Sequence, residues 1–288
     1  MIVVTGATGQ LGSAIIRALV QRVPASGVGA SARDPAKARP LSELGVRVRK
    51  GDFAEPESLA HAFEGATQVL LVSSNAAAFG GDPLAQHASA IAAARAAGAR
   101  RILYTSHMAA SAESAFPPAR DHAATEELLR ASGVAWTSLR DGFHGASAVW
   151  MLGEALKTGT YAAPADGKVC WTAHADLAEA AAAILAEEGR FEGPTPPLTG
   201  NELLDFAELT RLASEILDRS IRRQVTSNAD FQAALSARGV PAGVAAIALG
   251  FSCASQSGEF ARVDPTLEQL IGRRPTPMRE LLAKQLAR

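Results

Sequence analysis

The chain has 288 residues, of which 48% are hydrophobic and 20% are charged, close to the composition of an ordinary folded protein. This composition excludes a mainly disordered chain, and the length allows one large domain or two smaller ones. The 28 basic residues are balanced by 29 acidic ones, which gives a net charge of -1. A chain so close to neutral has no bulk attraction for nucleic acid or anionic lipid, so we expect neither as a partner.

The first half of the chain alternates short β-branched segments with Ala- and Leu-rich helical patterns. The predicted strands are residues 2–5, 28–32, 46–50, 68–73, 101–105 and 135–139. The predicted helices are residues 11–21, a short one capped by Asp34, and residues 56–63, 83–97 and 118–132. Strands that alternate with helices across short turns form βαβ units. We therefore predict an α/β fold with a doubly wound, Rossmann-type parallel sheet and helices on both faces.

The alternation loosens after about residue 143. Residues 144–167 are Gly-rich and mixed, whereas a strand at 168–172 and a helix at 174–188 are predicted to return to the sheet. The last stretch, 201–288, is mainly helical. The predicted organisation is a Rossmann domain formed by residues 1–143, with 168–200 returning to it, and a smaller substrate lobe formed by 144–167 and 201–288.

Cysteine usage and the first residues bear on the cellular compartment. Cys170 and Cys253 are far apart and form no C-x-x-C motif, which excludes a zinc or iron–sulfur site built on thiolates. We expect two buried, reduced thiols, and a single disulfide is the open alternative. The chain begins with a strand pattern, so we expect no signal peptide, and no run of 18 apolar residues occurs. We therefore expect a cytoplasmic protein with no metal site and no membrane partner.

A glycine-rich turn, Thr-Gly-Ala-Thr-Gly-Gln-Leu-Gly over residues 5–12, joins the first strand to the first helix. Gly6 permits the tight turn, Gly9 lets the backbone approach a pyrophosphate, and Gly12 lets the helix pack closely on the sheet. Free N–H groups at the helix N-terminus then hold negative charge. A tight turn without a ligand is the alternative, but the strand–turn–helix context favours a dinucleotide site. The expected cofactor contacts here are Gly6, Ala7, Thr8, Gly9, Gln10 and Leu11.

The residues after the second strand decide between NAD and NADP. An NAD site usually places Asp or Glu there for the ribose 2′-OH, whereas Arg accommodates a 2′-phosphate. Arg33 follows this strand and Lys37 lies one helical turn later, while Asp34 is one position late and is explained as a helix cap. A guanidinium matches phosphate geometry. We expect NADP(H) to be preferred and NAD(H) to be accepted as well. The alternative for Arg33 is a solvated surface charge.

The spacing G-x-x-G-x-x-G of the turn resembles the extended and atypical short-chain dehydrogenases/reductases, which bind NAD(P) with a Rossmann fold. This resemblance implies that Asp52 and Phe53, after the third strand, contact the adenine. Ser73, Ser74 and Asn75 follow the fourth strand, and ligands of such sheets bind at the C-terminal strand ends. We therefore expect these three beside the pyrophosphate and the nicotinamide ribose, with a plain polar turn as the alternative.

The usual catalytic pair of short-chain dehydrogenases is absent. That pair is Tyr-x-x-x-Lys, in which the Lys lowers the pKa of the Tyr so that it can donate a proton. The chain has two tyrosines, Tyr104 and Tyr161, and the residues four positions later are Met108 and Ala165. Tyr104 lies at the end of the fifth strand. We expect it to contact the cofactor, and a place in the core is the alternative.

Several segments along the whole chain carry a family likeness. They are the N-terminal turn and residues 33–38, 96–100, 104–106, 125–126, 139–142 and 267–277. In combination they resemble the NmrA-like atypical short-chain dehydrogenases/reductases, and among these the flavin-free NAD(P)H:quinone oxidoreductases of type 2 and the triphenylmethane dye reductases. The resemblance implies direct hydride transfer from NADPH to a quinone or a similar electron-poor aromatic acceptor, without flavin, and it suggests a homodimer. Positioning of the two reactants would supply much of the catalysis.

The acceptor is expected where the sixth strand ends. Where relatives have an aromatic pair after Asn-Gly, this chain has Phe143 and His144 after Asp141 and Gly142, which leaves the acceptor range open. We expect Gly142, Phe143 and His144 to bind the acceptor, with Phe143 stacking on it and His144 donating to its oxygen. The alternative is that Phe143 is lobe core and His144 is surface. The candidates for a catalytic role are His144, Ser106 and His107, and no proton donor is assigned.

A second function stays open beside the reductase. Some NmrA-like proteins are redox sensors that bind NADP(H) without performing chemistry, and the missing Tyr-Lys pair is compatible with either function. A sugar epimerase of the extended group is disfavoured, because those enzymes generally need the pair. A sensor would bind the dinucleotide but would not oxidise NADPH when an acceptor is added.

Overall fold

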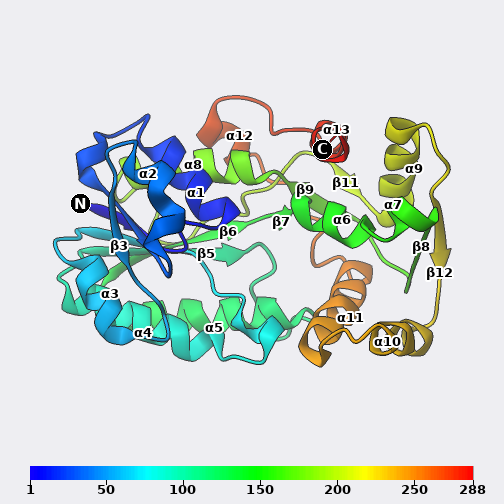
Figure 1. Cartoon of the computed structure of the whole chain (residues 1–288), viewed down its shortest axis with the longest axis horizontal. Helices are drawn as coiled ribbons and strands as arrows, with labels where there is room; N and C mark the ends of the chain where they lie inside the picture. The colour runs from blue at the N-terminus through cyan, green and yellow to red at the C-terminus, as the bar shows by residue number, and fades with distance from the viewer. Residues whose placement is uncertain (288) are drawn as a thin grey trace.

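The computed structural model describes residues 1–287, and a seven-stranded parallel sheet forms its larger body (Figure 1). The strands are β1 (Ile2–Val4), β2 (Val28–Ala32), β3 (Arg47–Lys50), β4 (Gln68–Leu71), β5 (Arg101–His107), β6 (Ala135–Asp141) and β10 (Gly193–Pro194). Their spatial order is β10-β6-β5-β4-β1-β2-β3, which reverses direction at β1 and β4. Ligands of doubly wound sheets bind at this reversal, beyond the C-terminal strand ends. The predicted Rossmann-type sheet is confirmed.

Helices cover both faces of this sheet (Figure 1). One face carries α1 (Gln10–Leu19), α8 (His174–Ala186) and α12 (Thr266–Ile271), and the other carries α3 (Pro56–Phe63), α4 (Pro83–Ala96) and α5 (Pro117–Ala131). The apolar residues of α1 recur at helical spacing, so Leu11, Ile15 and Leu19 all face the core. The short connecting elements are η1 (Ala25–Gly27), η2 (Pro35–Ala38), α2 (Arg39–Ser42) and η3 (Ala76–Phe79).

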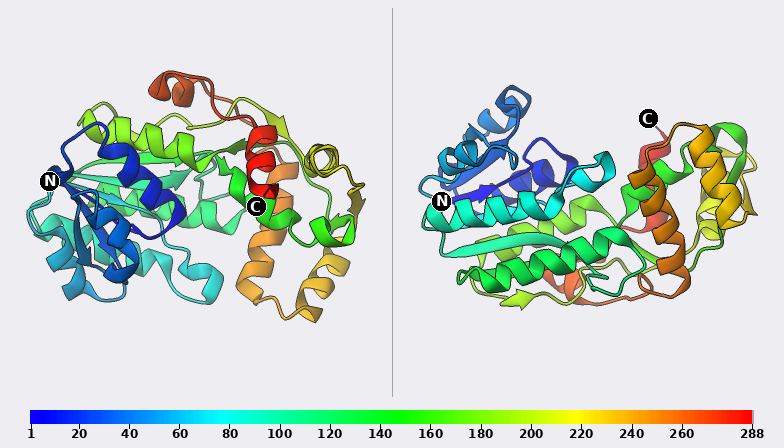
Figure 2. Two further views of the ribbon diagram at one scale, coloured as in Figure 1. Left: turned by 45° about the horizontal axis from the view of Figure 1, so that its top comes forward. Right: turned by 90° about the horizontal axis from the view of Figure 1, so that it is seen from below.

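A smaller lobe follows the sixth strand and adjoins the C-terminal ends of the sheet strands, as Figure 2 shows from two further directions. It contains a three-stranded sheet, a two-stranded sheet and most of the C-terminal helices. Its strands are β7 (Phe143–His144), β8 (Thr160–Ala163), β9 (Val169–Thr172), β11 (Leu203–Leu204) and β12 (Arg222–Val225). Its helices are α6 (Gly145–Leu152), α7 (Ala155–Thr158), α9 (Phe206–Leu217), α10 (Asn228–Ala237), α11 (Ala242–Gln256) and α13 (Met278–Leu286).

One predicted strand joins a different sheet. β9 was expected to return to the main sheet, but it pairs with β7 and β11 in the lobe, and β10 takes the edge position beside β6 instead. The helix that follows, α8, does return and packs against α1. The apolar sequence of β9 suits any buried strand, and Trp171 within it is buried among aromatic side chains of the lobe. Because the Trp171 ring is buried in the lobe, β9 pairs with the lobe strands. The residue pattern of a strand does not predict which sheet that strand joins.

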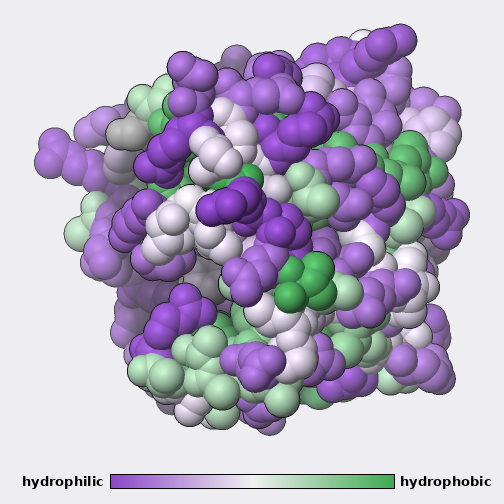
Figure 3. Space-filling view, turned by 90° about the vertical axis from the view of Figure 1, so that its right-hand side faces the viewer, coloured by the Kyte–Doolittle hydropathy of each residue, from purple (hydrophilic) through white to green (hydrophobic). Residues whose placement is uncertain are grey.

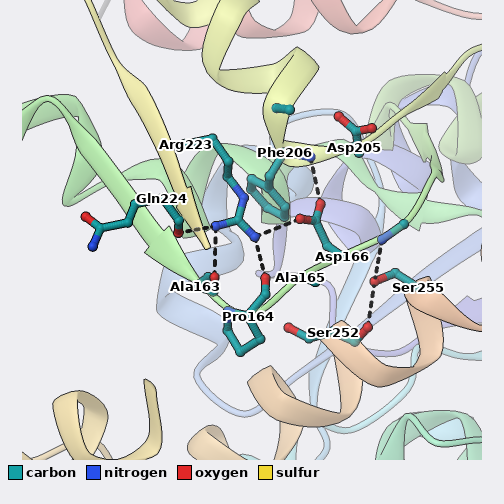
Figure 4. A network of polar contacts seen from close by, with 12 residues as sticks. Ala163, Pro164, Ala165, Asp166, Asp205, Phe206, Arg223, Gln224, Ser252 and Ser255 are labelled. Carbon is teal, nitrogen blue, oxygen red and sulfur yellow. Dashed lines mark hydrogen bonds and ion pairs between the residues drawn. The ribbon is translucent and has the colours of Figure 1, made fainter. Parts of the chain in front are cut away.

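A buried ion pair connects the outer strands of the lobe (Figure 4). A guanidinium nitrogen of Arg223 lies 2.8 Å from Oδ1 of Asp166, and both side chains are at most 10% exposed. Arg223 also donates to the carbonyl oxygen of Ala163 at 2.9 Å, and Oδ2 of Asp166 accepts the N–H of Phe206 at 2.8 Å. The pair therefore ties β8 and β12 to the first turn of α9.

The outer surface of the lobe is mainly hydrophilic, with scattered apolar side chains (Figure 3). Within residues 1–287, no helix has both the length and the apolar character needed to span a membrane. Both cysteines are free thiols, and Cys170 is buried as expected. Cys253 is exposed, contrary to prediction, because its position on α11 faces away from the core while Phe251 and Ala254 of the same helix are buried.

Candidate functional site

The turn after β1 is shaped to hold an anion. Gly6 has a φ of +60°, and a Cβ on Gly12 would lie only 2.4 Å from the carbonyl oxygen of Gly6, so both positions require glycine. The N-terminus of α1 has no side-chain cap and no acidic residue in its first turn. Its first N–H groups are therefore left for a ligand, and the helix dipole favours a negative one. This cradle fits a pyrophosphate.

The predicted cofactor residues of this turn differ in what they can offer. Gly6, Thr8, Gly9 and Gln10 are exposed on the turn. The side chains of Ala7 and Leu11 are buried in the core instead, so these two residues can contact a ligand only through their backbone.

Arg33 lies at the C-terminal end of β2 with an exposed side chain. It forms no hydrogen bond or ion pair with residues 1–287, whereas its basic neighbour Lys37 faces Asp34 at 3.9 Å. Asp34 caps the following turn, as predicted, by accepting the N–H of Ala36 at 3.1 Å. Arg33 is thus a basic side chain whose guanidinium is available to a phosphate beside the end of β2.

Asp52 and Phe53 follow β3 and are both partly exposed. Oδ1 of Asp52 accepts the N–H of Ala54 at 3.0 Å, which shapes the loop. The ring of Phe53 packs edge-on against His87, with ring centroids 6.3 Å apart. Asp52 and Phe53 therefore lie at the end of β3, beside β2, and the ring of Phe53 packs against His87 of α4.

The loop after β4 is held by side chains that the sequence did not single out. The N–H of Ser73 donates to Oγ1 of Thr105, and the N–H of Ser74 donates to Nε2 of His87, both at 2.9 Å. Burial lowers the pKa of His87 to about 4, so the ring is neutral and can accept. Asn75 is exposed. His87 is therefore a positioning residue for the loop, and its place in an Ala-rich helix gave no signal of that role.

Tyr104 and Ser106 do not reach the cleft. Tyr104 is fully buried and its hydroxyl lies 2.7 Å from Nδ1 of His122 on α5. Ser106 is also buried, and its hydroxyl donates to Glu126 at 2.8 Å. Glu126 in turn binds Arg140 through two of the guanidinium nitrogens. The expectations of a cofactor contact for Tyr104 and a catalytic role for Ser106 are therefore corrected: alternation along β5 turns both side chains into the layer between the sheet and α5.

His107 ends β5 where the body meets the lobe. Its Nδ1 accepts the N–H of Ala109 at 3.1 Å, which leaves the proton of the neutral ring on Nε2. Its ring stacks on His122 with centroids 6.0 Å apart. Burial, and secondarily the neighbouring His122 and His144, hold the pKa of His107 well below its usual range. His107 is thus a neutral hydrogen-bond donor rather than a group that titrates near pH 7.

Phe143 belongs to the core of the lobe rather than to an open acceptor surface. It is 8% exposed. Its ring lies 5.0–5.5 Å, centroid to centroid, from those of His107, Phe116, Trp171, Phe251 and Phe260. Gly142 before it is buried too, and a Cβ there would lie 2.3 Å from Oγ1 of Thr172. The expected stacking of Phe143 on the acceptor is corrected, because packing against five rings leaves no face free.

His144 remains beside the junction of body and lobe. Its ring centroid lies 4.4 Å from that of His174, the first residue of α8. Burial, and then His174, lower the pKa of His144 to about 3, and burial also lowers the pKa of His174. His144 is partly exposed, so its neutral ring can offer one N–H to a ligand.

The fold and this site define an α/β protein of the Rossmann class with a dinucleotide cradle at the switch point of its sheet. No group of three or more His, Cys, Asp or Glu side chains among residues 1–287 is arranged to hold a metal ion.

Comparison with known proteins agrees with this class and refines it. The model of an NAD(P)H-binding family matches residues 6–188. Quinone oxidoreductase 2 of Escherichia coli (strain K12) is 38% identical over 285 residues, which cover 97% of this chain and 96% of that protein. The chain belongs to this NAD(P)H-binding family.

Two solved structures extend the likeness over almost the whole fold. An NADPH-dependent quinone oxidoreductase from Escherichia coli complexed with NADPH has a TM-score of 0.91 at 34% identity, covering 99% of this chain and 100% of that one. Citrobacter sp. triphenylmethane reductase complexed with NADP(H) has a TM-score of 0.87 at 36% identity, covering 99% of each chain. The predicted family is confirmed.

Proposed function

We propose that the protein is an NAD(P)H-dependent reductase that passes hydride from NADPH directly to a quinone or a similar electron-poor aromatic acceptor, without flavin. The full-length likeness to a quinone oxidoreductase and a triphenylmethane reductase, both solved with NADP(H), carries this proposal. The open, uncapped N-terminus of α1 and the unpaired Arg33 among residues 1–287 support it, since together they suit a dinucleotide that bears a 2′-phosphate.

We assign the following binding roles to residues of this chain. The turn at Gly6 and the first N–H groups of α1 bind the pyrophosphate, and Arg33 binds the 2′-phosphate. Asp52 and Phe53 border the adenine, and the loop at residues 73–75 borders the nicotinamide ribose. NADPH supplies the hydride. His144 and His107, both neutral donors near the junction with the lobe, orient the acceptor oxygen.

The wider organisation belongs to the same proposal. We assign residues 1–142 and 173–200, together with α12, to the cofactor domain, and residues 143–172 and the rest of 201–288 to a substrate lobe. Two free thiols fit a reducing cytoplasm. A homodimer follows from the family likeness, and equilibrium sedimentation would check it.

The test is steady-state oxidation of NADPH by the purified protein with a panel of small quinones and a triarylmethane dye. Acceptor-dependent oxidation is expected, with a lower KM for NADPH than for NADH. Tight NADP(H) binding without turnover on any acceptor would refute the reductase and identify a redox sensor. A flavin absorbance spectrum that copurifies with the protein would contradict direct hydride transfer.

A further inference from the structure

Asp141 is a buried carboxyl group that the residues around it leave unbonded. It is the last residue of β6 and is 3% exposed. Its backbone carbonyl accepts the N–H of Met108 at 2.8 Å, but no N–H or O–H of residues 1–287 donates to its side chain. The carboxyl is therefore a buried polar group at the C-terminal end of β6 without a hydrogen-bond partner among the described residues.

The position of this carboxyl is at the edge of the sheet where ligands of doubly wound folds bind. Asp141 stands opposite His107 in the β5–β6 register, and a bridge to Leu198 fixes its other side. Gly142 follows and leads the chain directly into β7 of the lobe. Asp141 thus lies at the boundary between the cofactor-binding body and the lobe, two strands away from β4 and the loop that follows it.

No cation compensates the charge that Asp141 would carry. The adjacent Arg140 is bound to Glu126, and Arg101 of β5 is bound to Glu192. The histidines of the surrounding elements are His107 on β5, His144 on β7 and His174 on α8, and burial lowers the pKa of each. The carboxylate of Asp176 on α8 is engaged by Arg273.

Burial without a compensating cation raises the pKa of Asp141 well above its usual range. The neutral carboxylic acid is the form that such a site favours, and it carries an O–H that the described residues do not use. A neutral acid beside a cofactor cleft is the arrangement that general-acid catalysis needs.

We propose that Asp141 is the proton donor of the reduction, a role that rests on the proposed function. The acceptor takes a hydride, which converts NADPH to NADP⁺ and leaves one acceptor oxygen anionic. The O–H bond of Asp141 then breaks, and its proton passes to that oxygen. The products are the hydroquinone and the Asp141 carboxylate, and a proton from solvent restores the acid before the next turnover.

The test compares wild type with Asp141→Asn, which keeps the shape and removes the transferable proton. At pH 7 and without acceptor, infrared spectroscopy should show a protonated carboxyl band in wild type that this variant lacks. With acceptor, we expect Asp141→Asn to lower kcat/KM at least about tenfold at pH 6 and to abolish the alkaline limb of the wild-type pH profile, with the Kd for NADPH unchanged. Asp121→Asn is the matched control, since burial also raises the pKa of Asp121, but on α5, and it should change none of these readouts.

Two results would overturn the role of Asp141 while leaving the reductase intact. One is an Asp141→Asn variant that keeps the wild-type rate and alkaline limb. The other is the absence of the protonated carboxyl band in wild type at pH 7. Absence of NADPH oxidation with every acceptor would instead refute the proposed function, and the role of Asp141 with it.

Discussion

Lowering the pH from 7.5 to 5.5 perturbs five histidines of this structure at once. Burial lowers the pKa values of His87, His122 and His144 to about 4, 3 and 3, and it also lowers those of His107 and His174. In the unfolded chain the same groups bind protons near pH 6.5. Between these values the unfolded state binds more protons, so stability is fully present above about pH 6.5 and is lost as the pH falls.

The size of this effect follows from proton linkage. Each histidine that stays neutral costs about 1.4 kcal/mol per pH unit below its unfolded pKa, so His87, His122 and His144 together cost about 4 kcal/mol at pH 5.5. The lowered pKa values of His107 and His174 act in the same direction. Asp141 acts in the opposite direction, because its raised pKa favours the folded state as the pH falls. A loss of about 4 kcal/mol from these three histidines is a large part of the 5–15 kcal/mol that domains typically have.

Urea denaturation followed by circular dichroism at pH 7.5, 6.5 and 5.5 measures this loss. His122→Gln keeps a polar partner for the Tyr104 hydroxyl and should reduce the loss by about 1.4 kcal/mol. His61→Gln, at an exposed site, is the matched control and should leave the loss unchanged. A free energy of unfolding that changes by less than about 1 kcal/mol between pH 7.5 and 5.5 would refute the reasoning.

Three further predictions concern the cofactor site and the lobe. Arg33→Ala should raise the KM for NADPH at least about tenfold and leave that for NADH nearly unchanged, and equal effects on both would refute the 2′-phosphate contact. Gly12→Ala places a Cβ 2.4 Å from a carbonyl oxygen, so calorimetry should show weaker NADP(H) binding and a lower Tm, whereas unchanged binding would contradict the tight cradle. Arg223→Met leaves Asp166 buried without its partner and should cost about 3–5 kcal/mol in urea denaturation, with the NADPH KM as the unaffected control; a cost below about 1 kcal/mol would contradict that role.

The sequence alone was sufficient for the features that depend on local patterns. Strand and helix alternation predicted the parallel sheet, and the positions of Gly6 and Gly12 predicted the cradle, because both follow from neighbours along the chain. The cap at Asp34 and the exposed Arg33 are equally local. The family was also predicted from short motifs that are spread along the whole chain.

Only the tertiary structure decided which polar side chains face the cleft. Tyr104 and Ser106 lie on the α5 side of β5, and Phe143 is enclosed by rings from distant parts of the chain. His87 accepts the N–H of Ser74, which lies 13 residues away in the sequence. Asp141 has no cation partner among the described residues, and the neighbouring Arg140 is bound to Glu126 instead. Burial and pairing are properties of the packed chain, because they are set by residues far apart in sequence, and they determine which titratable groups are neutral.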